Sequence, residues 1–161
     1  MRPAEFRFDE SEHPRDENGR FTNKEVLYES ESGGSVVKNY KGTPKEERAN
    51  FAALKTFADN GSKVVLLETK KGYKVRTADC TINGVEWEIK TNQTATISAI
   101  DNAVHSCNGQ SKNLILNVTS SLSDEDVFTG IKGRIMRTNI ENIVVERNGE
   151  IQARYKREDF V

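Results

Sequence analysis

The chain has 161 residues, and its 24 Lys and Arg nearly balance its 25 Asp and Glu, which gives a formal net charge of −1. This length allows one domain with a substantial core and is too short for two ordinary domains. The balanced charge lacks the overall signature of a nucleic-acid-binding protein, although a local basic patch would suffice. We expect a soluble chain, because no apolar run approaches the ~18 residues of a membrane span and no signal peptide is visible.

Residues 1–42 are rich in charge, Gly and Ser and have almost no periodic apolar pattern. Such a composition is typical of a linker or a weakly ordered arm. Within it, VLYES and SVVKNY predict at most short edge strands. We therefore place the folded domain at residues 43–161.

The folded domain begins with helix signals in TPKEERANFAALKTFADNG, which has a cap-like Thr, a Pro in the first position, early acids and a closing Asn-Gly. The continuous apolar run KVVLLE, residues 63–68, predicts a buried strand. Asn83-Gly84 then predicts a two-residue hairpin with strands near 73–80 and 85–91, a register in which Cys80 faces Trp87.

The remaining segments predict a helix, a strand, a helix and a second hairpin. TATISAIDNAVHSCNG has helical apolar spacing and a Gly stop, NLILNV (113–118) is an apolar strand, and SDEDVFTGIKGRIMRT has Ser123 as N-cap. The second hairpin turns at Asn148-Gly149. The order predicts a mixed α/β domain with a central sheet covered by helices. Cys80 and Cys107 lie in apolar patterns and predict buried thiols, since two cysteines make neither a disulfide framework nor a zinc site.

The first hairpin carries an unusual set of charges. In the predicted register Asp79 faces Glu88, and alternation places Lys90 on the same face. Like charges directly opposite each other destabilise a sheet, so these carboxylates need a neutralising partner. Two carboxylates can hold Mg²⁺, with Mn²⁺ or Zn²⁺ as alternatives, and the lysine can orient a water or stabilise charge on a phosphoryl group. The competing interpretation is a solvated strand face on which Lys90 relieves Glu88.

The order of elements around these residues resembles the core of the PD-(D/E)XK nuclease superfamily, α-β-β-β-α-β, here followed by an added helix and hairpin. Asp79 and Glu88 fall where that superfamily has metal ligands, and Lys90 falls where it has its catalytic lysine. Ala78 stands in place of the motif's proline.

The stretch from Glu46 to Val118 resembles, more closely, the C-terminal tRNase domain of contact-dependent growth-inhibition toxins. The features that carry the resemblance are KEERANFAALKTFADNG with KVVLL, D-x(3)-NG-x(2)-WE-x-K-T, and GQ-S-K-NLILNV. It implies a metal-dependent endonuclease toxin that acts on tRNA, or on DNA with the same site, in the bacterial cytoplasm, with a cognate immunity protein. The arm sequence HPRDENGRF resembles tail regions of phage head-morphogenesis and portal-type proteins, which implies a module carried on a phage or mobile element.

The resemblance also implies further site residues. Glu47 is chosen over Glu46 as the acid of the first helix, although an ordinary first-turn acid explains either equally well. Gln110 matches a Gln before the next strand, or simply caps the helix end. The hydroxyl of Thr91 meets a phosphate or binds the backbone.

The basic residues that could line a phosphate groove are Lys112, Lys132, Arg134 and Arg137, against the alternative of a solvated helix face. We interpret His105 as a surface or boundary residue, because the metal mechanism does not require it. A metal-independent RNase that uses His105, and a non-catalytic binding module on the same fold, remain the rival hypotheses.

Overall fold

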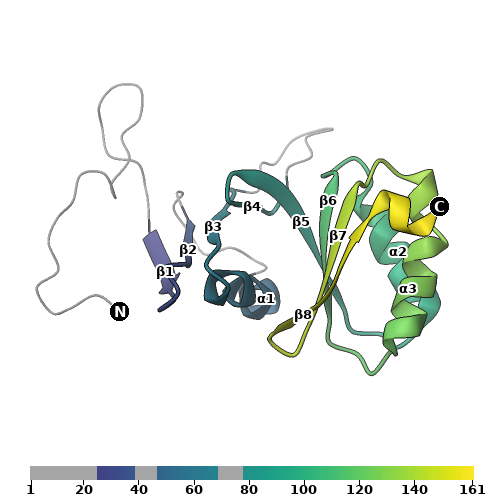
Figure 1. Cartoon of the computed structure of the whole chain (residues 1–161), viewed down its shortest axis with the longest axis horizontal. Coiled ribbons are helices and arrows are strands. Elements are labelled where there is room, and N and C mark those ends of the chain that lie inside the picture. The colour runs from purple at the N-terminus through teal and green to yellow at the C-terminus, as the bar shows by residue number, and fades with distance from the viewer. Residues whose placement is uncertain (1–24, 39–46, 69–77) are drawn as a thin grey trace, which may run out of the picture.

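The computed structural model describes residues 25–38, 47–68 and 78–161, and for residues 47–49 only the backbone. Its sheet of eight strands follows the chain order from β1 to β8 (Figure 1). The strands are β1 Glu25–Glu29, β2 Ser35–Lys38, β3 Lys63–Leu66, β4 Cys80–Ile82, β5 Val85–Asn92, β6 Asn113–Val118, β7 Asn142–Arg147 and β8 Glu150–Lys156. The helices are α1 Glu47–Asp59, α2 Ile97–Cys107 and α3 Asp124–Lys132, with short 3-10 turns η2 Ile135–Arg137 and η3 Arg157–Phe160. The predicted α/β fold is confirmed.

The helices lie on opposite faces of the sheet. Helix α1 connects the parallel strands β2 and β3, whereas α2 and α3 connect the parallel strands β5, β6 and β7. Leu114 and Leu116 of β6 pack with residues of α2 and α3, while Ile115 between them packs with residues of α1. Figure 1 shows α1 beside the first half of the sheet and α2 and α3 together beside the second half.

Helix ends follow local sequence signals. The side chain of Thr96 accepts a hydrogen bond from Ala99 N at the start of α2, and Ser123 accepts one from Asp126 N at the start of α3. Gly109 follows α2 with a φ of +85°, a conformation that favours glycine. None of the helices in the described ranges has the length and apolar character needed to span a bilayer.

Residues 25–38 are more regular than their polar composition suggested. β1 and β2 form an antiparallel pair, and β2 also pairs in parallel with β3, so β2 is internal and not at an edge. Val36 is fully buried against α1 and β3 residues. The HPRDENGRF segment and the proposed boundary at residue 43 lie outside the described residues.

Candidate functional site

The predicted register of the first hairpin is confirmed. Ile82 pairs with Val85 and Cys80 with Trp87. Asn83 and Gly84 have positive φ angles of 51° and 85°, which the two-residue turn requires at its tip. The second hairpin has the same pair of positive φ angles at residues 148 and 149.

Asp79 ends the ladder between β4 and β5. Its backbone N–H donates to Trp87 O at 3.1 Å, and its carboxylate Oδ2 accepts from Ile89 N at 2.8 Å. The side chain therefore takes the place that the next backbone carbonyl of a longer ladder would occupy. This bond fixes one carboxylate oxygen of Asp79 against β5, next to the residues that the sequence grouped with it.

Glu88 and Lys90 occupy the face of β5 that α2 covers. In the parallel register they align with Leu114 and Leu116 of β6, which belong to the core beneath α2 and α3. The Glu88 side chain is only 2% exposed, and its Oε2 lies 3.8 Å from Nζ of Lys90, which is 26% exposed. A buried carboxylate is costly unless charges or donors compensate it. The solvated strand face considered from the sequence is therefore wrong for Glu88.

The charges of Asp79, Glu88 and Lys90 all act on the buried Cys107 thiol at the end of α2. Burial is the main reason that the pKa of the Cys107 thiol is raised from 9.0 to about 12; Glu88 and Asp79 also raise it, and Lys90 lowers it. On the other face of the sheet, the pKa of the Cys80 thiol is also raised. Burial is the largest cause, and the negative charges of Asp79 and Glu88 add to it. Both cysteines are free and buried, as predicted.

The Cys107 thiol gives a test of this environment. Between pH 9 and about 12 it keeps its proton in the folded protein but loses it in the unfolded chain, so the free energy of unfolding falls as pH rises through this window. The expected contribution is about 1.4 kcal/mol per pH unit. Urea denaturation across this range will show a shallower pH dependence for Cys107→Ala than for the unaltered chain. Equal slopes would contradict the raised pKa, since Cys80 is common to both proteins.

Gln110 follows α2 on the side of the sheet that carries Glu88 and Lys90. Its backbone N–H donates to Cys107 O at 2.9 Å. Its side-chain Oε1 is buried and has no hydrogen-bond partner in the described part of the chain. Burying an amide oxygen without a partner costs free energy. This atom is therefore suited to accept a hydrogen bond from a ligand or to coordinate a cation.

Glu47 is the first residue of α1, but its side chain is outside the described structure, so its role stays a prediction. The Thr91 hydroxyl takes a role that the sequence did not suggest. It donates to Oδ1 of Asn50 at 3.1 Å and accepts from Nδ2 of Asn117 at 3.5 Å, on the α1 face of the sheet. The sequence signal for this role was Asn117, a polar residue that interrupts the apolar run NLILNV.

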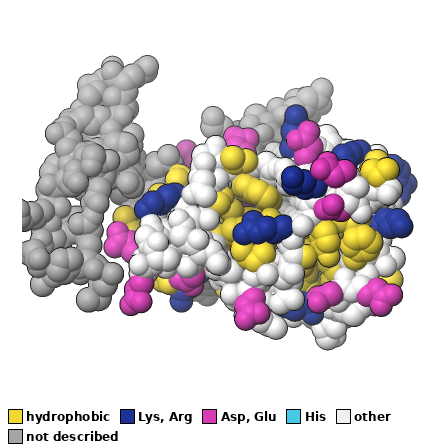
Figure 2. All heavy atoms as spheres, in the orientation of Figure 1, with side chains coloured by type: hydrophobic (Ala, Val, Ile, Leu, Met, Phe, Trp, Pro, Cys, Tyr) yellow, Lys and Arg dark blue, Asp and Glu magenta, His cyan; other side chains and the backbone are white. Residues whose placement is uncertain are grey.

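Three of the candidate phosphate-groove residues lie at or just after the end of α3, and Lys112 lies directly before β6. Arg134 lies just after α3, and its Nε donates to Asp101 of α2 at 3.0 Å. Lys112 is exposed and lies 3.9 Å from Glu141. Lys132, Arg137 and His105 are also exposed, the last as predicted. Figure 2 shows basic and acidic side chains interspersed around apolar ones on the face in view.

Asp79 and Glu88 offer only oxygen atoms, which are the ligands that hard divalent cations prefer. No group of three or more His, Cys, Asp or Glu is arranged for a metal in the described residues. If Asp79 and Glu88 hold Mg²⁺, waters or phosphate oxygens would supply its further ligands, since Mg²⁺ keeps several waters and uses few carboxylates. The oxygen-only set favours Mg²⁺ or Mn²⁺ over Zn²⁺.

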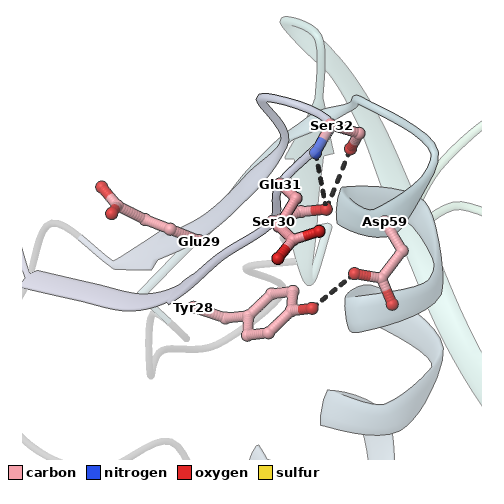
Figure 3. Close-up of a pocket in the computed structure, with 6 residues that line it drawn as sticks. All are labelled: Tyr28, Glu29, Ser30, Glu31, Ser32 and Asp59. Carbon is pink, nitrogen blue, oxygen red and sulfur yellow. Dashed lines mark hydrogen bonds between the residues drawn. The ribbon is translucent and has the colours of Figure 1, made fainter. Parts of the chain in front are cut away.

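The structure also has a pocket of about 620 Å³ at the β1 edge of the sheet, away from β5 and the residues of this site. It is lined by the end of β1, the β1–β2 turn and Asp59 at the end of α1 (Figure 3). The Tyr28 hydroxyl donates to Asp59, and this bond is the main cause of a raised Tyr28 pKa. No residue singled out from the sequence lines it.

Comparison with known proteins bears on the segment that contains the site. Residues 76–151 match the family described as the contact-dependent growth inhibition CdiA C-terminal domain. The match covers just under half of the chain and includes Asp79, Glu88, Lys90 and Gln110. It agrees with the CdiA part of the sequence resemblance; membership of the PD-(D/E)XK superfamily and the phage connection stay predictions.

A solved structure supports the fold beyond the CdiA C-terminal segment. The chain is similar to one described as a CdiA-CT/CdiI toxin and immunity complex from Burkholderia pseudomallei, with a TM-score of 0.53 and 23% identity. The alignment covers 75% of this chain and 98% of the other. At this identity the likeness establishes a shared fold. A comparison with curated proteins gives no match.

Proposed function

We propose that this chain is a contact-dependent growth-inhibition toxin domain that hydrolyses phosphodiester bonds of nucleic acid, with tRNA the favoured substrate and DNA the alternative. The observation that carries the proposal is the arrangement on β5. The Asp79 carboxylate is fixed by Ile89 N beside a buried Glu88 that lies 3.8 Å from Lys90. The match of residues 76–151 to the CdiA C-terminal domain supports the toxin role.

Each side chain has a task in the proposed reaction. Asp79 and Glu88 would hold a divalent cation, which supplies an activated water and stabilises charge on the phosphate. The Lys90 ammonium is held next to Glu88 and donates to the attacking water or to a phosphate oxygen as negative charge develops. Gln110 Oε1 accepts a hydrogen bond from the substrate or completes the cation's ligands, and Glu47 is proposed as a further acid.

The partners follow from the same similarity. The solved relative is a toxin and immunity complex. We propose that this chain also has a cognate immunity protein and acts in the cytoplasm of a target bacterium, after delivery from another cell or by a phage or mobile element. Lys112 and Arg134 are proposed to contact substrate; Arg134 would do so while it is anchored to Asp101.

The substrate experiment compares purified protein on total tRNA and on plasmid DNA, each with Mg²⁺, Mn²⁺, Zn²⁺ or EDTA. Discrete tRNA fragments that require metal and vanish with Asp79→Asn are expected. The asparagine amide oxygen can still accept from Ile89 N, so this change removes charge and keeps the end of the ladder. Asp126→Asn, in the first turn of α3, is the matched control. Metal-dependent cleavage of plasmid alone would change the substrate to DNA. Cleavage in EDTA that Asp79→Asn does not affect would overturn the proposed mechanism, and no cleavage of either polymer would favour the binding module.

Metal binding can be measured without any substrate. Mg²⁺ at about a hundred times its dissociation constant is expected to stabilise the protein by about 2.7 kcal/mol, because it binds only the folded site. Asp79→Asn should abolish this gain and should melt at a higher temperature than the unaltered chain in EDTA, since it removes repulsion between nearby carboxylates. Thermal melts with and without Mg²⁺ check both expectations. The absence of any shift in either condition would argue against a metal site.

A further inference from the structure

A hydrogen-bonded chain of side chains connects α1 to the sheet on the face opposite Glu88 and Lys90. Thr91 of β5 donates to Asn50 Oδ1 of α1 at 3.1 Å and accepts from Asn117 Nδ2 of β6 at 3.5 Å. Asn50 is 7% exposed and Asn117 is 5% exposed. Polar groups at this depth cost free energy unless they are hydrogen-bonded, so the Thr91 hydroxyl satisfies both neighbours at once.

The position of Thr91 in the sheet connects the Asn50–Thr91–Asn117 hydrogen bonds to the site on the opposite face. Ladder pairing of β5 with β4 ends at Trp87, and the Asp79 carboxylate extends the contact only to Ile89. Beyond that point β5 pairs with β6, and no second strand borders it within residues 25–38, 47–68 and 78–161. Among the described residues no strand borders Lys90–Asn92 on its β4 side, and Asn50 from α1 contacts this segment through Thr91.

We propose that Thr91 and Asn50 are positioning residues. They hold the Lys90–Asn92 segment of β5 at a fixed position relative to α1 and thereby position the Lys90 side chain. The inference rests on the proposed function and deepens it. Thr91 directly follows Lys90, so a shift of the Thr91 backbone moves the lysine on the opposite face. Glu47 precedes Asn50 by one helical turn, so the same contact also fixes the start of α1 relative to β5.

The test compares Thr91→Val with Thr91→Ser. Valine keeps the shape and removes the hydroxyl, whereas serine keeps the hydroxyl. Thr91→Val is expected to lower the single-turnover rate of tRNA cleavage at saturating Mg²⁺ about tenfold, because misplacement by a fraction of an ångström is costly to a reaction that depends on alignment. Affinity for tRNA in EDTA should change by less than about twofold, because no substrate contact is removed. Thr91→Ser should restore most of the rate.

The chain offers a matched control in Thr56. This residue is also buried on α1 and also bonds to the sheet, with its Oγ1 donating to Glu146 Oε1 of β7 at 3.2 Å. Thr56→Val should destabilise the protein at least as much as Thr91→Val in urea denaturation, because it weakens the bonding of a buried carboxylate. It should nevertheless cleave tRNA at the unaltered rate.

The outcomes separate the two proposals. Unaltered cleavage by Thr91→Val, or an equal loss of rate in Thr56→Val, would overturn the positioning role while the proposed nuclease function stands. A serine variant as slow as the valine variant would also overturn it, since the hydroxyl would then be irrelevant. A native chain that cleaves neither tRNA nor DNA with any metal overturns both proposals. If plasmid is the polymer cleaved, the same comparison is made on plasmid.

Discussion

Replacement of Lys90 by methionine is expected to lower the single-turnover rate of nucleic-acid cleavage by about 10²–10³-fold. The Lys90 ammonium is the positive side-chain charge placed 3.8 Å from the buried Glu88 carboxylate, and methionine keeps the stem while removing that charge. Cleavage of tRNA under saturating Mg²⁺ is the measurement. Lys55→Met is the control, because Lys55 is exposed on α1 and lies over the Tyr28 ring, 5.0 Å from its centroid.

Stability separates a catalytic role of Lys90 from a structural one. Loss of the ammonium near Glu88 is expected to cost about 3 kcal/mol of unfolding free energy, because the Glu88 side chain is only 2% exposed and loses the positive charge 3.8 Å away. A variant that is folded, binds tRNA and does not cleave it would fit the proposed role. Cleavage within about threefold of the unaltered rate would instead show that the lysine only neutralises Glu88.

Replacement of Gly34 by alanine is expected to be the most damaging change to the fold, with a loss of about 3 kcal/mol or more in unfolding free energy. A Cβ at this position would lie 1.8 Å from the carbonyl oxygen of Ala58 and 2.8 Å from its Cα. These are backbone atoms at the end of α1, so no side-chain rotation can relieve the clash. Either β2 or α1 must move, and Val36 would lose part of its packing.

The neighbouring glycine provides the control. Gly33 has a φ of +92°, but a Cβ there would meet no atom within 4 Å. Gly33→Ala is therefore expected to cost about 1 to 2 kcal/mol through backbone strain alone. Urea denaturation of the two variants checks the difference. If Gly34→Ala were no less stable than Gly33→Ala, the close approach of β2 to α1 would be wrong.

The sequence by itself determined the elements whose signals are local. The Asn-Gly turns set both hairpins, the side chains of Thr96 and Ser123 begin their helices, and alternation put Lys90 and Glu88 on one face. Each of these signals acts between residues a few positions apart, where backbone geometry and short-range hydrogen bonds suffice.

The tertiary structure decided which of those residues bond to one another. Arg134 was predicted to contact phosphate, and it bonds to Asp101 across 33 positions of sequence; Thr91 bonds to Asn50 across 41. No local sequence pattern identifies Asp101 or Asn50 as these partners, because the pairing depends on how the helices lie over the sheet. The burial of Glu88 has the same origin. The sequence pattern of its strand is compatible with one solvated face, but in the tertiary structure α2 covers that face.

The first strands make the same point about composition. Residues 25–38 are polar, and pattern alone gave them short edge strands, yet β2 is internal between β1 and β3. Its place depends on Gly34, which lets the strand approach the end of α1, and on Val36, which the core fully buries. Local propensity shows that a segment can form a strand; burial against distant elements decides which strand it pairs with, because the free energy of packing exceeds the weak preferences of single residues.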